Sequence, residues 1–190
     1  MNVVDVIDME DPNLGSNREI FIRRDAPVLG YQPNIIRLYG MCNGVAQMVT
    51  EIIRNAPQGG IDVLRLWSHG WSGGMNVSTG LNAQAGADHR SAIWIHNIGS
   101  YANDLRRLRR YFARHGRIEL KGCSVASGPD GERLVVSLAS TVGVSVRAGV
   151  DVQGGPGVVW APGITWNGPV IESDASGALQ CVDYSVLSAF

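Results

Sequence analysis

The sequence predicts an α/β domain in which a mostly parallel β-sheet carries helices on both of its faces. Strand-like and helix-like segments alternate from residue 34 to residue 149, which is the order that βαβ units require. The expected strands are largely apolar, as is typical of parallel strands that are buried on both faces. Hydrophobic residues make up 45% of the 190 residues and charged residues 17%, so the composition is that of a globular domain.

Apolar periodicity distinguishes the helices from the strands in this part of the chain. Val45, Met48, Val49, Ile52 and Ile53 recur at three-and-four spacing and define the first helix. Short runs rich in Val, Ile and Leu define the strands. The expected strands cover residues 34–39, 61–68, 92–96, 117–122 and 144–149, and the expected helices cover about 43–55, 100–114 and 130–142.

The first 33 residues show no regular pattern. Pro12, Pro27 and Pro33 interrupt them, and only residues 20–23 resemble a short strand. We therefore expect an irregular N-terminal extension over residues 1–33, followed by the α/β domain over residues 34–190.

Two later segments are also irregular. Residues 69–91 are rich in Gly, Ser and Asn, and a loop of this length inside a compact domain is usually functional or contains a small hairpin. In the C-terminal tail, Asn167-Gly168 predicts a hairpin turn.

Charge and hydropathy argue against two classes of partner. The net charge of -1 provides no general attraction to nucleic acid or to anionic membranes. No apolar run approaches the roughly 20 residues of a membrane span. The first residues carry acids, and they lack the basic segment that begins a secretory signal. We therefore expect the protein in the cytoplasm, or as one domain of a secreted effector.

The three cysteines, Cys42, Cys123 and Cys181, are widely spaced. This spacing favours reduced thiols over a disulfide framework, and it lacks the paired ligands of a structural zinc site. The histidines also lack a zinc-site spacing. We therefore expect no metal and no cofactor, and the surroundings of each thiol become informative.

Two of the expected strands end in residues that can perform chemistry. One ends in Trp67-Ser68-His69-Gly70, and the other ends in Lys121-Gly122-Cys123-Ser124. In open parallel sheets, reactive groups collect beyond the carboxyl ends of the strands. If these two strands are neighbours, His69 and Cys123 face each other at one edge of the sheet.

A thiol and an imidazole in this position can cleave an acyl bond. A free thiol is only a few per cent ionised at neutral pH, so it needs a base to form the nucleophilic thiolate. His69 can take this proton and later donate one to the leaving amine. The backbone N–H groups of Gly70 and Cys123 are candidate donors to the oxyanion. His96, at the end of a short strand, is the reserve candidate for the base.

At these two strand ends the sequence resembles the caspase-like cysteine peptidases of clan CD. The segments that carry the resemblance are VLRLWSHGWSGG (63–74) and RIELKGCSVASGPDG (117–131), and the similarity spans roughly residues 34–154. The nearest branches are small bacterial caspase-like domains and the self-processing protease domains of large bacterial toxins. The resemblance implies a caspase-like three-layer sandwich and a thiol endopeptidase that acts on protein or peptide substrates through a thioester, with self-processing as one mode of action.

The resemblance also implies roles for individual residues. His69 is the expected general base and Cys123 the nucleophile, acting as a dyad without a third acid. Relatives that cleave after Arg or Lys often carry an acid two residues before the cysteine, where this chain has Lys121. We therefore expect an uncharged or acidic substrate residue on the amino side of the scissile bond. Trp71 and Asp151 are further candidate substrate contacts.

An arginine-rich helix raises the question of an activating ligand. Its positive charges are most often a solvated face, but the toxin branch is triggered by an inositol polyphosphate. By this analogy, Arg106, Arg107 and Arg110 are candidate contacts for a polyanion.

Three other interpretations stay open. Gly70-Trp71-Ser72-Gly73-Gly74 matches the G-x-S-x-G pattern, so Ser72 is the candidate nucleophile of a serine esterase, although no helical pattern follows it. The domain can also be a non-catalytic caspase-like scaffold that binds through Trp67, Trp71 and Trp94. Finally, Cys123 can be a core cysteine, because cysteine is among the most buried residue types.

Overall fold

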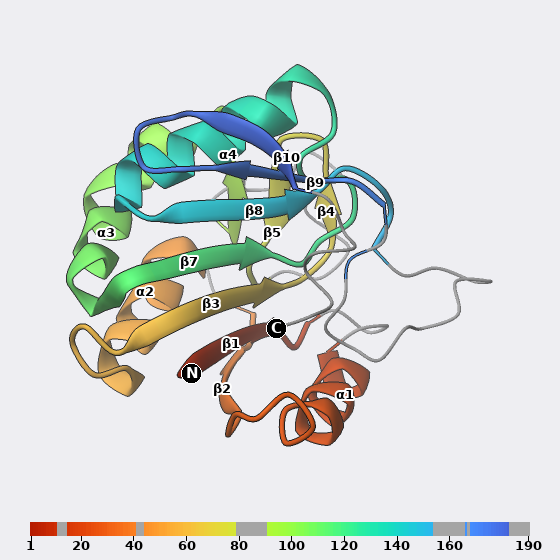
Figure 1. Cartoon of the computed structure of the whole chain (residues 1–190), viewed down its shortest axis with the longest axis vertical. Helices are drawn as coiled ribbons and strands as arrows, with labels where there is room; N and C mark the ends of the chain where they lie inside the picture. Colours follow the sequence, from red (N-terminus) through yellow and green to blue (C-terminus); the bar gives the residue numbers. More distant parts are fainter. Residues whose placement is uncertain (11–14, 41–43, 79–90, 154–165, 167, 183–190) are drawn as a thin grey trace.

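A seven-stranded sheet forms the centre of the protein (Figure 1). The computed structural model describes residues 1–10, 15–40, 44–78, 91–153, 166 and 168–182. The strands of this sheet are β1 (Val3–Asp8), β2 (Asn34–Leu38), β3 (Ile61–Trp67), β7 (Phe112–Leu120), β8 (Ser145–Gly149), β9 (Val170–Ser173) and β10 (Leu179–Val182). They lie side by side in the order β10-β9-β8-β7-β3-β1-β2. Neighbouring strands are parallel from β8 to β2, whereas β9 pairs antiparallel with both β8 and β10.

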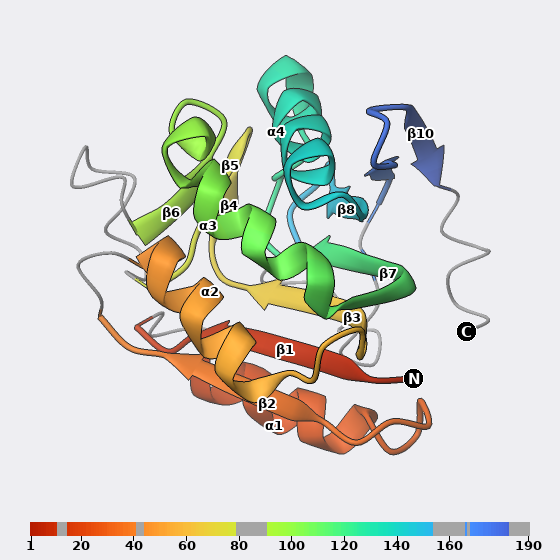
Figure 2. The same cartoon turned by 90° about the vertical axis from the view of Figure 1, so that its left-hand side faces the viewer.

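Helices cover both faces of this sheet, as Figure 2 shows. One face carries α1 (Gly15–Asp25). The opposite face carries α2 (Gly44–Asn55), the 3-10 turns η3 (Ile98–Tyr101) and η4 (Arg107–Tyr111) on either side of α3 (Ala102–Arg106), and α4 (Gly128–Val142). A small antiparallel sheet of β4 (Gly70–Trp71), β5 (Gly74–Asn76) and β6 (Ala92–Trp94) packs on the same side as α3 and α4. The predicted α/β class, with a mostly parallel sheet between two layers of helices, is confirmed.

The prediction of an irregular N-terminal extension is wrong. β1 lies inside the sheet, where it pairs in parallel with both β2 and β3. All six of its residues are buried, including Asp5 and Asp8, and these two acids obscured the strand pattern. The segment 20–23, expected to be a strand, lies within α1. Its sequence carries little amphipathic pattern because Arg18, like Ile22, is buried against the sheet.

The helix predicted over residues 100–114 is also shorter than expected. Its last turn ends at Tyr111, and β7 begins at Phe112, which pairs with Ile61 of β3. Phe112 continues the helical spacing of Leu108, so periodicity alone extended the helix into the strand.

Two hairpins occur in the segments that were expected to be irregular. The β4–β5 hairpin confirms the small hairpin expected within residues 69–91, of which 79–90 lie outside the described residues. Asn167 also lies outside them, and Gly168 precedes β9. The C-terminal hairpin joins β9 to β10 instead, and its turn is held by Asp174, whose Oδ1 accepts backbone N–H groups at 2.8 and 3.1 Å.

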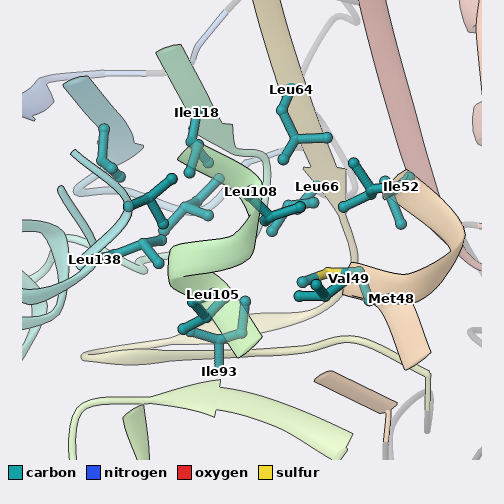
Figure 3. Packing of buried hydrophobic residues seen from close by; sticks show 14 of the residues in the cluster. Met48, Val49, Ile52, Leu64, Leu66, Ile93, Leu105, Leu108, Ile118 and Leu138 are labelled. Carbon is teal, nitrogen blue, oxygen red and sulfur yellow. The ribbon is translucent and has the colours of Figure 1, made fainter. Parts of the chain in front are cut away.

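The main hydrophobic core lies between the sheet and the layer of α2, α3 and α4 (Figure 3). Leu64 and Leu66 of β3 project into it, as does Ile118 of β7. The helices and the small sheet contribute Met48, Val49, Ile52, Ile93, Leu105, Leu108 and Leu138. Each fully buried side chain of this size contributes roughly 1.5–3 kcal/mol, so this layer supplies most of the driving force for folding.

The opposite face of the sheet is unusually polar. Asp5, Arg65, Glu119, Arg147 and Glu172 occupy directly paired positions on five neighbouring strands. Acid and base alternate along this row, and cross-strand neighbours of opposite charge stabilise a sheet. The strands were expected to be largely apolar, and this row shows that one face also carries buried charges beside apolar residues such as Val3, Ile7 and Val63.

None of the described helices combines the length and apolar character that a membrane-spanning helix needs.

Candidate active site

β3 and β7 are neighbours in the sheet and run in parallel, which meets the condition stated for His69 and Cys123 to share one edge of the sheet. Leu66 pairs with Leu120 near their carboxyl ends, and the Lys121 N–H donates to the Leu66 carbonyl at 2.8 Å. The two strands therefore end level with each other. The segments that carry His69 and Cys123 begin at the same edge of the sheet (Figure 1).

Glycines allow these two segments to touch through their backbones. A Cβ atom placed on Gly70 would lie 2.8 Å from the Cys123 carbonyl oxygen and 3.1 Å from its backbone nitrogen. A Cβ atom on Gly122 would lie 3.1 Å from both the Gly70 Cα and the Ser68 carbonyl oxygen. The glycine after His69 and the glycine before Cys123 are thus explained by close packing, since a larger residue would separate the two strand ends.

Hydrogen bonds hold the backbone on both sides of His69. Before it, the hydroxyl of Ser68 donates to Oδ2 of Asp8 at 2.9 Å. After it, the His69 carbonyl accepts the N–H of Asn76 at 2.9 Å. The imidazole itself is half-buried. The ring is therefore carried by a short segment that is fixed to β1 on one side and to β5 on the other.

Cys123 lies at the start of a sharp turn. Its thiol is half-buried, and Sγ is 3.8 Å from the carbonyl oxygen of Gln153. The next residue, Ser124, adopts a left-handed backbone conformation with φ of 54°, which costs a non-glycine residue on the order of 1 kcal/mol. The Ser124 N–H donates to the Asp151 carbonyl at 2.9 Å, which holds this turn in place. Cys123 is therefore neither sealed in the core nor fully exposed.

The other cysteines are differently placed. Cys181 is exposed on β10. Cys42 lies outside the described residues.

The expected effect of Lys121 on substrates assumed that its ammonium meets solvent beside Cys123. The ammonium does not meet solvent there. The Lys121 side chain is only 3% exposed, and its Nζ lies 3.6 Å from Oε2 of Glu119. The same ammonium lies 3.4 Å from the centre of the Trp166 ring. Burial lowers the pKa of Lys121 to about 7, and Arg65 adds to this shift while Glu119 opposes it. A substrate could approach this ammonium only after Trp166 moved.

Aromatic and cationic side chains alternate beneath the two strand ends, which sequence analysis did not anticipate. The Arg18 guanidinium lies 4.6 Å from the centre of the Trp67 ring. The Lys121 ammonium lies 5.9 Å from the centre of the same ring and also contacts the Trp166 ring. Trp67 also donates from Nε1 to Asp5 at 2.8 Å. Every second residue of a strand points to the same face, and this alternation places Trp67 and Lys121 on the polar face of the sheet. The sequence could have predicted their position from this spacing.

The two further substrate-binding candidates, Trp71 and Asp151, differ in burial and in the groups that they contact. Trp71 is half-buried in β4, and its ring covers Gly74 across the hairpin. Asp151 is exposed, and its carbonyl, rather than its carboxylate, holds the turn after Cys123.

Ser72 lies in the turn of the β4–β5 hairpin. Its hydroxyl donates to the Ser127 carbonyl, and the chain continues into β5. A hydrolase nucleophile elbow requires a strand, a sharp turn and then a helix. The GWSGG segment therefore has a hairpin geometry and not an elbow geometry.

The reserve base and the arginines occupy other parts of the molecule. His96 lies between β6 and η3, with Nε2 3.8 Å from Asp130 of α4. Arg106, Arg107 and Arg110 belong to α3 and η4, which precede β7, whereas Cys123 follows it. The nine residues of β7 span about 30 Å, so this basic group lies near the opposite end of the strand from the thiol. Arg107 already pairs with Asp104 at 3.2 Å.

The fold and the site define an α/β protein whose two central parallel strands deliver an imidazole and a thiol to one edge of the sheet. A family model described as "Domain of unknown function (DUF4347)" matches residues 28–161, and the chain belongs to this family. The match includes β3, β7 and both strand ends. A comparison with curated proteins found no match.

Proposed function

We propose that this protein is a cysteine endopeptidase with Cys123 as its nucleophile and His69 as its general base. The observation that carries the proposal is the backbone contact between Gly70 and Cys123 at the ends of two neighbouring parallel strands. This contact supports the proposal because it joins the segments that carry the proposed base, nucleophile and two backbone donors, and acyl transfer requires such groups.

The proposed reaction uses these parts in sequence. The His69 imidazole takes the Cys123 proton, and the thiolate attacks the carbonyl carbon of the peptide bond. The N–H groups of Gly70 and Cys123 stabilise the oxyanion that forms. When the C–N bond breaks, the amine leaves with the proton from His69, and a thioester remains on Cys123. Water, deprotonated by His69, then hydrolyses the thioester and regenerates the thiol.

The segment after β8 governs access to the thiol in this proposal. The Gln153 carbonyl lies 3.8 Å from Sγ of Cys123, within reach of a weak S–H···O hydrogen bond from the thiol. The proton must pass from this contact to His69 before attack. A bound peptide that displaces Gln153 provides this change.

Substrate preference in this proposal follows from the resemblance to the caspase-like peptidases. Relatives that cleave after Arg or Lys often carry an acid two residues before the cysteine, where this chain has the buried Lys121. A basic substrate residue on the amino side of the scissile bond therefore lacks that acidic partner here. We propose an uncharged or acidic residue at that position. Profiling with a peptide library tests this, and a preference for Arg or Lys would contradict it.

Covalent labelling tests the peptidase proposal directly. The purified protein is treated with a peptidyl acyloxymethyl ketone that has an uncharged residue next to the reactive group, and the labelled site is found by mass spectrometry. We expect one label at Cys123, none in Cys123→Ala, and at least tenfold slower labelling in His69→Ala. Cys181→Ser is the matched control, because it removes an exposed thiol away from the site, and it should label as the wild type does.

Other results of this experiment would favour the alternatives. Equal labelling of Cys181 and Cys123, with no effect of His69→Ala, would contradict the dyad. A serine-directed phosphonate that reacts at Ser72 would favour the esterase. A biological activity that survives Cys123→Ala would favour the non-catalytic scaffold.

A further inference from the structure

We propose that Asp8 and Ser68 act together as positioning residues for His69, an inference that rests on the proposed peptidase function. The observation is the hydrogen bond from the Ser68 hydroxyl to Oδ2 of Asp8, 2.9 Å long. Asp8 is 2% exposed and Ser68 is 3% exposed, so water does not compete for this bond. It connects the end of β1 to the residue immediately before the proposed base.

A buried carboxylate at this position needs a reason, because taking a charge out of water is costly unless it is paired or hydrogen-bonded. One oxygen of Asp8, Oδ1, accepts the Glu10 N–H at 3.1 Å, which is an ordinary local turn. The other oxygen reaches across to β3 and accepts the Ser68 hydroxyl. The turn that ends β1 does not require this second hydrogen bond. The bond instead holds the segment that carries His69.

Contacts with both neighbouring strands, β1 and β7, hold Ser68 in place. Its hydroxyl faces Asp8 on the β1 side, while its carbonyl lies against Gly122 on the β7 side. These two contacts restrict rotation of the backbone at Ser68. The direction of the following residue, His69, is therefore set by the same two contacts that align β1, β3 and β7.

This arrangement matters because proton transfer depends strongly on geometry. The imidazole must lie within hydrogen-bond reach of the thiol, directly or through one water. A displacement of about 1 Å at a reacting group can reduce the rate about 100-fold. We therefore expect Ser68→Ala and Asp8→Ala to reduce kcat by about 10- to 100-fold with little change in KM. Ala removes both acceptor oxygens of Asp8, whereas an Asn amide could still donate to the Ser68 hydroxyl oxygen and keep the contact.

The test measures Cys123 itself and does not depend on knowing a substrate. In a Cys181→Ser background, the rate of alkylation by iodoacetamide is followed by mass spectrometry from pH 5.5 to pH 9.5, below each variant's Tm. We expect the wild-type thiol to be alkylated at least about tenfold faster than the thiol of His69→Ala at pH 7, because the imidazole takes the thiol proton. Ser68→Ala and Asp8→Ala should shift toward the His69→Ala profile, and combining them should add little.

Matched variants separate positioning from general damage. Ser68→Thr keeps the hydroxyl and should restore the wild-type profile, while Ser68→Val has the shape of Thr without the hydroxyl and should not. Ser173→Ala removes another buried serine hydroxyl, which donates to the Asp174 carbonyl just after β9, and should leave the profile unchanged.

The outcomes distinguish the two proposals. If His69→Ala leaves the wild-type profile unchanged, the peptidase proposal itself is overturned. If the profile depends on His69 but is the same in Ser68→Val and Asp8→Ala as in the wild type, the dyad stands and the positioning role is overturned. If Ser68→Ala does not fold, Asp8→Ala carries the test alone, and a wild-type profile in that variant overturns the positioning role.

Discussion

Arg65 and Glu119 face each other across β3 and β7, with Nε of Arg65 2.9 Å from Oε2 of Glu119. Both side chains are about 5% exposed. Glu119 also accepts from Nε of Arg117 at 2.9 Å and lies 3.6 Å from Nζ of Lys121. Burial alone would raise the pKa of Glu119, but Lys121, Arg65 and Arg117 outweigh it and hold this pKa well below its usual value. Glu119 is therefore the central acid of the polar face.

Glu119→Gln should strongly destabilise the protein. The substitution keeps the shape of the side chain but leaves Arg65 and Lys121 buried without their shared counter-charge. Breaking a buried ion pair in this way costs about 3–5 kcal/mol, which urea unfolding measures. The control is Glu132→Gln, at an exposed position of α4, with an expected change within about 0.5 kcal/mol. A loss below about 1 kcal/mol for Glu119→Gln would show that the row is not a major source of stability.

Acidification should change the stability contributions of Glu119 and Asp5, two of the three acids in the row, with opposite signs. The pKa of Glu119 is lowered from 4.5, so its stabilisation is present above pH 4.5 and is lost as the pH falls toward the folded value. Burial raises the pKa of Asp5 above 3.8, despite Arg65 nearby, so Asp5 favours the folded state as the pH falls. Between pH 7 and pH 3, the free energy of unfolding should therefore fall less in Glu119→Gln than in the wild type, and more in Asp5→Asn. Urea unfolding at each pH measures this, and changes of the same sign in both variants would contradict it.

Lys121 is the single lysine of the chain, so its titration can be observed without overlap. The 13Cε signal of lysine labelled with 13C should titrate with a midpoint near 7, because burial lowers the pKa of Lys121 to about 7 from 10.5. Trp166→Ala should raise this midpoint, since it removes the ring that covers the ammonium. Tyr39→Ala, at an exposed residue after β2, is the control and should leave it unchanged. A midpoint near 10.5 in the wild type would mean that water reaches the ammonium.

The same lowered pKa predicts how stability changes in mild alkali. Between pH 7.5 and pH 9.5 the unfolded chain keeps the proton on Lys121 while the folded protein has lost it. Stability should therefore rise with pH in this window. Lys121→Met removes the effect, so its free energy of unfolding should rise less. Urea unfolding at the two pH values provides the comparison, and equal slopes in both proteins would contradict it.

Hydrophobic patterns within short segments of the sequence predicted individual helices and strands. The periodicity of Met48 and Ile52 identified α2, and the apolar run before His69 identified β3. The proposed site required β3 and β7 to be neighbours, a condition that the sequence could state but not establish, and the two strands do pair in the sheet.

The remaining features depend on partners that are distant in sequence. β1 was missed because Asp5 and Asp8 interrupt its apolar pattern, and the groups that satisfy them, on Trp67 and Ser68, lie 62 and 60 residues away. The charged row exists only when five strands come into register. Trp166 was not connected with Lys121 because 45 residues with no shared pattern separate them, and only the fold brings them to 3.4 Å.

Gly70→Ala tests the close approach on which the proposed site depends. The added Cβ would lie 2.5 Å from Cγ2 of Val125 and 2.8 Å from the Cys123 carbonyl oxygen, so the two strand ends must separate. We expect a loss of about 1–3 kcal/mol in the free energy of unfolding, which is typical of overpacking, together with slower labelling of Cys123. Gly99→Ala is the matched control, because a Cβ at Gly99 meets no atom within 4 Å, and its stability should change by no more than about 0.5 kcal/mol. If Gly70→Ala keeps wild-type stability and labelling, the contact between the strand ends is looser than the proposed dyad requires.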